Sequence, residues 1–162
     1  MANRWTSRHL LLIVAFILLS VSAGVGIVYR TFSNPIPHAG PSFTWSNKDR
    51  LTIDLVEAKR AFDLEAAVFI DTRPHRSYVG SHISGAISLP LNEFENRVHE
   101  LLSGLPTDMP IITYCSGGAC QSSVKLAKLL IERLGYTNTR VFYDGWDMWV
   151  SAGYPTTHGD VP

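Results

Sequence analysis

The sequence predicts an α/β domain built on a largely parallel sheet flanked by helices and preceded by one apolar membrane segment. After residue 47, short apolar runs alternate with stretches of helical hydrophobic period, a pattern typical of this fold class. Residues 10–29 form a run of twenty positions without a charged side chain. The chain is therefore expected to contain a cytoplasmic amino terminus (1–9), a transmembrane helix or signal peptide (10–29), a proline-rich tether (30–47) and the α/β domain (48–162).

The overall composition is that of a folded domain without excess charge. The 162 residues are 46% hydrophobic and 17% charged, with 14 basic and 14 acidic side chains and 2 cysteines. Such a composition excludes a disordered chain and a disulfide-stapled miniprotein. The balance of charge gives no reason to expect nucleic acid as a partner.

The apolar segment is long enough to cross a bilayer. At about 1.5 Å per residue, a helix over 10–29 matches a hydrocarbon core of about 30 Å. Arg4 and Arg8 precede this segment and only Arg30 follows closely, so the amino terminus is expected in the cytoplasm. We therefore expect a single-pass anchor in the inner cell membrane, with the domain on the periplasmic side.

A cleaved signal peptide is the alternative for this segment. The run Leu10–Leu19 has the length of a signal-peptide core, and Val21–Ala23 is an acceptable cleavage site. A retained anchor is favoured because Val25–Tyr29 continue the apolar stretch beyond that site. With cleavage the protein would be periplasmic or secreted, and in both cases the domain is exported.

The first half of the domain is expected to contain two helices and a buried strand. Asp54 and Glu57 have the spacing of a capping box, which predicts the start of a helix. Val68–Ile70 is an apolar run that predicts a buried strand ending at Asp71. Apolar residues recur at near-helical spacing over Leu91–Leu102, which predicts the second helix.

The second half of the domain is expected to contain two strands around one long helix. Ile111–Tyr114 and Val141–Tyr143 are the apolar runs that predict the strands. Ser122–Leu134 has the clearest helical period, and Gly135 is placed to end that helix. The apolar side of the helix is expected to consist of Val124, Ala127, Leu130, Ile131 and Leu134.

The chemistry of the sequence concentrates in the loop that follows Ile111–Tyr114 and begins at Cys115. This loop is expected at the carboxyl edge of the sheet, where open α/β folds bind ligands. Its two glycines allow several N–H groups to point at one spot, and the next helix dipole adds positive potential. Cys115 is then a thiolate nucleophile near neutral pH; the alternative is a small buried structural cysteine. The expected anion cradle consists of Ser116, Gly117, Gly118, Ala119, Cys120 and Gln121.

Four ordered motifs between Ile53 and Thr156 resemble those of single-domain rhodaneses. They are an Asp-x-Arg strand end in Val68–Arg73, a His-Ile-x-Gly-Ala turn in Tyr78–Pro90, the Cys115 loop and the closing segment Gly145–Pro155. The resemblance implies a Rossmann-like domain around a central parallel sheet. It also implies a sulfurtransferase in which Cys115 takes a sulfane sulfur from a small donor such as thiosulfate. The resulting persulfide passes that sulfur to a thiol or a cyanide-like acceptor.

The cysteine loop departs from the family pattern in one place. Rhodaneses often carry arginine at the fifth position after the cysteine, and related phosphatases carry it at the sixth. Here these positions are Cys120 and Gln121. Without a guanidinium group to hold a tetrahedral dianion, phosphatase and arsenate reductase chemistry is disfavoured.

The second cysteine of this C-x4-C loop offers another reaction. Cys120 can attack a persulfide on Cys115, release hydrosulfide and leave an intraloop disulfide. The domain would then be a non-turnover module that binds sulfide or persulfide or responds to thiol redox state. The alternative role of Cys120 is that of a small residue in the arginine position.

The remaining polar candidates are expected to support the structure. Asp71 can accept backbone hydrogen bonds and Arg73 can pair with a carboxylate, so both are expected to hold the loop after their strand. The histidines and cysteines lack a recognisable metal-ligand spacing. We therefore expect no metal and no cofactor.

Overall fold

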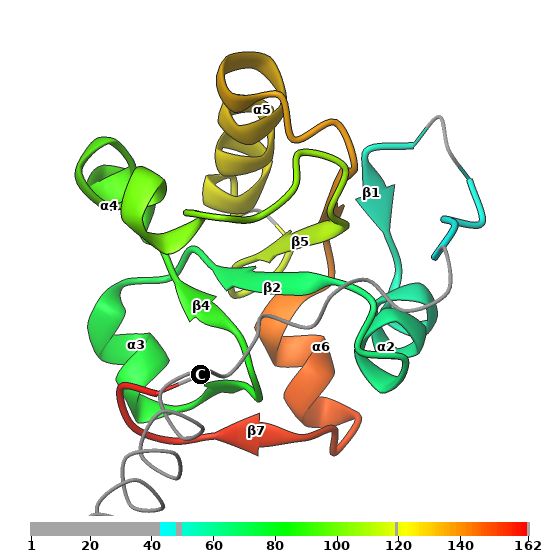
Figure 1. Cartoon of the computed structure of the whole chain (residues 1–162). Coiled ribbons are helices and arrows are strands. Elements are labelled where there is room, and N and C mark those ends of the chain that lie inside the picture. Colours follow the sequence, from blue (N-terminus) through cyan, green and yellow to red (C-terminus); the bar gives the residue numbers. More distant parts are fainter. Residues whose placement is uncertain (1–42, 48–49, 119, 162) are drawn as a thin grey trace, which may run out of the picture. The chain divides into compact units, whose positions relative to one another are not determined.

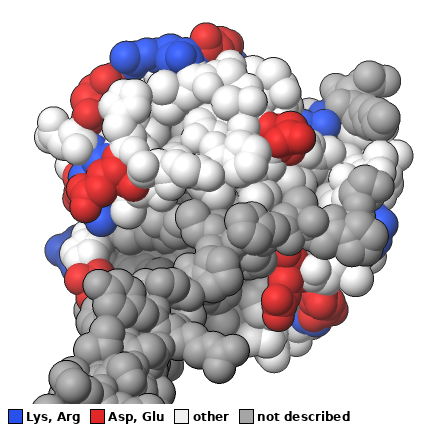
Figure 2. Space-filling view, viewed as in Figure 1, with Lys and Arg blue, Asp and Glu red and all other residues white. Residues whose placement is uncertain are grey.

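The computed structural model describes residues 43–47, 50–118 and 120–161. The predicted transmembrane segment and most of the tether lie outside these residues. No helix in the described part of the chain is long and apolar enough to span a membrane. On the face seen in Figure 2, basic and acidic side chains are interspersed over the described surface, without one large patch of either sign.

A five-stranded sheet forms the centre of the described domain (Figure 1). Its strand order is β1-β6-β5-β2-β4, and every neighbouring pair is parallel. The expected parallel α/β sheet is therefore confirmed. Its strands are β1 (Thr52–Ile53), β2 (Val68–Asp71), β4 (Ile87–Ser88), β5 (Ile111–Tyr114) and β6 (Thr139–Phe142).

Helices connect these strands, as parallel pairing requires. A second, two-stranded sheet pairs β3 (His82–Ile83) with β7 (Thr156–Thr157) in antiparallel orientation. The helices are α2 (Leu55–Asp63), α3 (His75–Gly80), α4 (Phe94–Leu101), α5 (Ser122–Leu134) and α6 (Gly145–Ser151), and a 3-10 turn, η1 (Leu91–Glu93), precedes α4.

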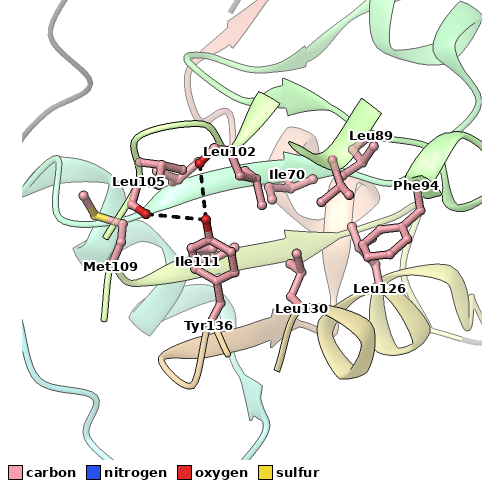
Figure 3. Packing of buried hydrophobic residues seen from close by; sticks show 12 residues of the cluster. Ile70, Leu89, Phe94, Leu102, Leu105, Met109, Ile111, Leu126, Leu130 and Tyr136 are labelled. Carbon is pink, nitrogen blue, oxygen red and sulfur yellow. Dashed lines mark hydrogen bonds between the residues drawn. The ribbon is translucent and has the colours of Figure 1, made fainter. Parts of the chain in front are cut away.

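The central sheet has a separate hydrophobic core on each face, because side chains alternate along a strand. Ile70 and Ile111 pack against α4 and α5, the face shown in Figure 3. Phe69 and Ile112 belong to the opposite core, where they join residues of α2 and α6 that include the fully buried Trp149. Burial of both faces explains why β2 and β5 are mostly apolar in the sequence.

Local signals placed several helix ends correctly. Asp54 caps α2 by accepting a hydrogen bond from the Glu57 N–H at 2.9 Å. The carboxylate of Glu57, however, accepts from the N–H of Ser46 at 2.5 Å, so the capping box is only half formed. The bounds of α5 are as predicted, and Gly135 ends it with a left-handed φ of 75°.

The last parallel strand differs from the predicted one at both ends. It is Thr139–Phe142 and not Val141–Tyr143, because Thr139 pairs in register with Ile111. The Thr139 hydroxyl donates to the carbonyl of Tyr136 at 2.8 Å, so a polar residue is buried where hydropathy predicts a loop.

The buried face of α5 also differs from the predicted one. Its buried residues include Ser123 and Leu126, whereas Val124 and Ile131 are only partly buried. The apolar period alone does not assign Ser123 to the core. Its burial follows from contacts that its hydroxyl and carbonyl make with two neighbouring residues, one of them Cys115.

Candidate active site

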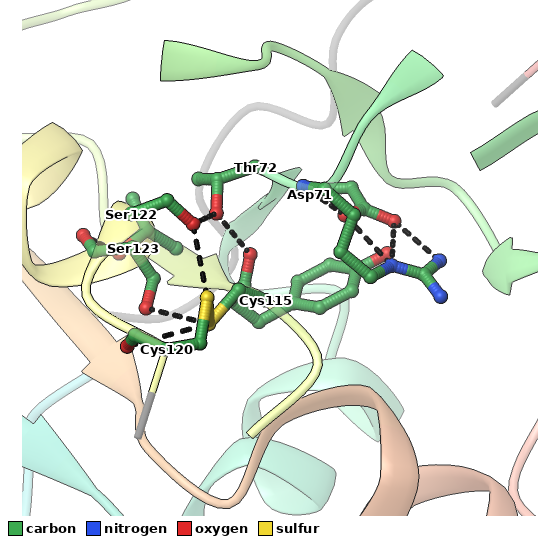
Figure 4. The surroundings of a disulfide bond; sticks show 9 residues. Asp71, Thr72, Cys115, Cys120, Ser122 and Ser123 are labelled. Atoms are coloured by element: carbon green, nitrogen blue, oxygen red, sulfur yellow. Dashed lines mark hydrogen bonds and ion pairs between the residues drawn. A yellow bond between two sulfur atoms is a disulfide. The ribbon is translucent and has the colours of Figure 1, made fainter. Parts of the chain in front are cut away.

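The cysteine loop connects β5 to α5 at the carboxyl end of the central sheet, as the sequence predicts. Cys115 directly follows β5, and Asp71 ends the neighbouring strand β2. The N–H and hydroxyl of Thr72 donate to the Tyr114 carbonyl at 2.9 and 3.0 Å. The segments after β2 and β5 are thus held side by side at one edge of the sheet (Figure 4).

The two cysteines of the loop are joined in a disulfide (Figure 4). Their Cα atoms are 6.4 Å apart, within the range of about 4.4–6.8 Å that disulfides bridge. Cys115 is only 2% exposed, whereas Cys120 is half-buried. In this form neither sulfur is a thiolate, so the nucleophile predicted at Cys115 exists only after reduction.

Two hydroxyl groups contact the sulfur atoms, and a third bonds to one of them. The buried Ser123 hydroxyl donates to the Cys115 sulfur at 3.4 Å. Ser122 Oγ lies 3.2 Å from the Cys120 sulfur and 2.7 Å from Thr72 Oγ1. Sequence reasoning missed these residues. The available signal was a pair of serines in the first turn of the helix that follows the loop.

The start of α6 holds the first part of the cysteine loop. The N–H of Trp146 donates to the Cys115 carbonyl at 2.8 Å, and that of Asp147 donates to the Ser116 carbonyl at 3.0 Å. Gly145 has a φ of 63°, and a Cβ there would overlap the Cys115 carbonyl oxygen and lie 2.8 Å from the Gly117 nitrogen. Glycine is required at this contact because two backbones meet there.

The predicted anion cradle is partly occupied by the chain itself in this form. The Gly118 N–H donates to the Tyr143 carbonyl at 3.2 Å, and the Cys120 N–H donates to the Gly117 carbonyl at 3.2 Å. Within the described part of the loop, the N–H groups of Ser116, Gly117 and Gln121 have no backbone acceptor. Ala119 lies outside the described residues.

Asp71 and Arg73 form a buried ion pair beside the loop. The Arg73 Nη2 is 2.6 Å from Asp71 Oδ2, and it also donates to the Ser81 carbonyl at 2.7 Å. The Arg73 guanidinium lies 4.2 Å from the centre of the Trp146 ring. Burial, and then the charge of Asp71, raise the pKa of Tyr114 well above its ordinary value, so this phenol stays neutral.

A pocket of about 610 Å³ opens beside the loop. It lies between the segment after β2, the turn η1 and the start of α5. Cys120 contributes to its wall and Cys115 does not. The lining also includes Thr72, His75, Asn92, Ser116 and Ser122.

Residues 54–152 match the profile of the Rhodanese-like domain. The chain belongs to the rhodanese-like family. The match includes the complete cysteine loop and the Asp71–Arg73 pair, so the rhodanese-like α/β fold expected from the four motifs is confirmed.

The rhodanese-like domain is similar to several solved structures. The BH2092 protein from Bacillus halodurans has a TM-score of 0.59 and 24% identity, covering 70% of this chain and 80% of its own. A rhodanese-related protein from Thermoplasma volcanium has a TM-score of 0.54 and 20% identity, covering 67% and 98%. These two likenesses concern the fold. The thiosulfate sulfurtransferase from Pseudomonas aeruginosa has a TM-score of 0.54 and 30% identity, covering 70% and 21%.

The chain is also similar to a curated protein. An HTH-type transcriptional regulator of Mycobacterium tuberculosis is 31% identical over 107 residues, 66% of this chain and 45% of the regulator. This chain therefore spans less than half of that relative. Family membership supports a sulfurtransferase-type domain, and the reaction of this chain has to be argued from its own site.

Proposed function

We propose that the reduced protein is a sulfurtransferase that carries a sulfane sulfur on Cys115. The main support is the position of Cys115 in a rhodanese-like domain, at the start of the loop after β5 with the Ser123 hydroxyl donating to its sulfur. That hydrogen bond favours a negatively charged sulfur. The similarity to a thiosulfate sulfurtransferase makes thiosulfate a suitable donor for a first assay.

The reaction proceeds in two displacements. The Cys115 thiolate attacks the outer sulfur of thiosulfate, the sulfur–sulfur bond of the donor breaks, and sulfite leaves with the electron pair. Cyanide or a thiolate then attacks the terminal sulfur of the Cys115 persulfide and restores the thiolate. Loop N–H groups stabilise the charge on the terminal sulfur. Among the described residues, the N–H groups of Ser116, Gly117 and Gln121 have no competing backbone acceptor.

The test is thiocyanate formation by the reduced full-length protein with thiosulfate and cyanide. We expect Cys115→Ser to abolish turnover and Cys120→Ser to retain it. Cys120→Ser is the matched control, since it also replaces one sulfur of the loop by oxygen. Turnover that survives Cys115→Ser would overturn the proposal.

A thiol-redox or persulfide-binding module is the second candidate, and the Cys115–Cys120 disulfide favours it. The Cys120 thiolate attacks Sγ of the Cys115 persulfide, the bond to the outer sulfur breaks, hydrosulfide leaves and the disulfide forms. Such a module consumes at most one sulfur per reduced chain. Intact masses and sulfide release distinguish it from an enzyme, because Cys120→Ser should retain the persulfide and release no sulfide.

We propose that a helix over 10–29 anchors the protein, with residues 1–9 in the cytoplasm, 30–47 as a tether and 48–162 in the periplasm. The support is the uncharged run itself and the two arginines that precede it, Arg4 and Arg8. Amino-terminal sequencing of the membrane-bound protein should find the segment retained. A mature chain starting at Gly24 would exclude the anchor.

A further inference from the structure

We propose that the pocket beside Cys120 receives a small thiol, which reduces the loop disulfide by attacking the Cys120 sulfur and releasing Cys115. The proposal rests on the cysteine pair of the proposed function, because it concerns how the oxidised loop returns to the form with a Cys115 thiolate. We call this cavity the thiol pocket; its lining includes Thr72, His75, Asn92, Ser116, Cys120 and Ser122.

The two sulfurs differ in their accessibility. Cys115 is 2% exposed and does not line the thiol pocket, whereas the half-buried Cys120 does. Thiol–disulfide exchange needs a thiolate to reach the sulfur that it attacks, so access selects between the two ends of the bond. A thiol in this pocket therefore meets Cys120 first.

The hydroxyl groups around the disulfide make Cys115 the better leaving group. The Ser123 hydroxyl donates to the Cys115 sulfur at 3.4 Å and stabilises the charge that develops there when the bond breaks. Attack at the opposite end would place this charge on Cys120, whose nearest hydroxyl belongs to Ser122, at 3.2 Å.

The proton of the Ser122 hydroxyl is not available to Cys120. Thr72 donates its own hydroxyl proton to the Tyr114 carbonyl at 3.0 Å. In the 2.7 Å contact between Thr72 and Ser122, Ser122 must then be the donor. Ser122 consequently presents a lone pair to the Cys120 sulfur, which disfavours a thiolate at that position.

The reduction balances in two exchanges. The incoming thiolate attacks Cys120 Sγ, the bond between the two cysteine sulfurs breaks, and the electron pair leaves on Cys115 as its thiolate. A second thiolate attacks the outer sulfur of the mixed disulfide, so a small-molecule disulfide departs and Cys120 becomes a thiol after protonation. Two thiols supply both electrons, and Cys115 becomes available for sulfur transfer after the first exchange.

The first test identifies the cysteine that forms the mixed disulfide. The oxidised full-length protein is treated briefly with glutathione, quenched in acid, alkylated with N-ethylmaleimide and analysed by peptide mass spectrometry. We expect glutathione on Cys120 and the alkyl group on Cys115. Glutathione found mainly on Cys115 would overturn the proposal.

The second test blocks the pocket without touching the cysteines. Asn92 is an exposed lining residue in η1, and Asn92→Trp should slow reduction by glutathione about tenfold, since exchange depends on access. Asn96→Trp makes the same change at an exposed position of α4 outside the lining and should react like the parent. Equal rates for the two variants would refute the thiol pocket.

The thiocyanate assay keeps this proposal separate from the proposed function. An adduct on Cys120 together with absent turnover in the reduced protein would refute the sulfurtransferase and support the thiol pocket. Turnover with no disulfide in the oxidised protein would refute the thiol pocket and leave the sulfurtransferase standing.

Discussion

Replacing Gly145 by alanine is expected to destabilise the fold by about 3 kcal/mol and to abolish the proposed sulfur transfer. Gly145 has a φ of 63°, and a Cβ there would overlap the carbonyl oxygen of Cys115 and lie 2.8 Å from the nitrogen of Gly117. Both neighbours are backbone atoms of the cysteine loop, so no side-chain rotation can relieve the overlap. The loop and α6 must therefore move apart.

The magnitude follows from two contributions. A left-handed backbone costs a residue with a Cβ about 1–2 kcal/mol, and overpacking in a rigid environment adds about 1–3 kcal/mol. The displacement also weakens the hydrogen bonds from Trp146 and Asp147 to the carbonyl groups of Cys115 and Ser116. Turnover should be lost even where the variant remains folded, because these carbonyl groups fix the position of Cys115, the proposed nucleophile.

Gly153→Ala is the matched control, and urea unfolding followed by tryptophan fluorescence is the assay. Gly153 has a φ of 70°, and among the described residues no atom beyond its chain neighbours lies within 4 Å of the position of its Cβ. This variant should lose only the backbone contribution of about 1–2 kcal/mol and keep its turnover. Equal losses of stability in the two variants would refute the close approach of α6 to the cysteine loop.

Three further predictions concern buried polar groups around the site. Asp71→Asn should lower the free energy of unfolding by about 3–5 kcal/mol, because Arg73 remains buried without its carboxylate; a loss below about 1 kcal/mol in urea unfolding would contradict this role. Burial raises the pKa of Tyr78 from 10.0 to about 12. At a pH between these two pKa values, the tyrosine loses its proton in the unfolded state and keeps it in the folded state. Stability should therefore fall as pH rises through this interval, and Tyr78→Phe should reduce the slope measured by urea unfolding. Ser123→Ala should slow alkylation of reduced Cys115 at neutral pH about fivefold, since the lost hydrogen bond stabilises the thiolate by about 1 kcal/mol. If the variant and the parent are alkylated at the same rate at every pH, the Ser123 hydroxyl does not stabilise the thiolate.

The sequence predicts the elements whose signals are local. The apolar run of β5, the helical period of α5 and the glycine after that helix each specify a boundary, and the structure places them there. The same signals put Cys115 between a strand and a helix. They fail at β6, since Thr139 and Arg140 are buried through strand pairing and packing that short-range hydropathy does not contain.

The different surroundings of the two cysteines depend on tertiary contacts. The sequence by itself determines a parallel α/β domain with a cysteine pair in the loop after one strand, because period, turn residues and spacing are properties of short segments. Only the folded chain brings Ser123 against the Cys115 sulfur and links Ser122 to Thr72, 50 residues away. It also covers Cys115 while Cys120 faces a pocket. Which sulfur is reachable, and which one can hold a charge, is thus decided by neighbours that are distant in sequence, because accessibility and hydrogen-bond direction exist only after the strands have paired.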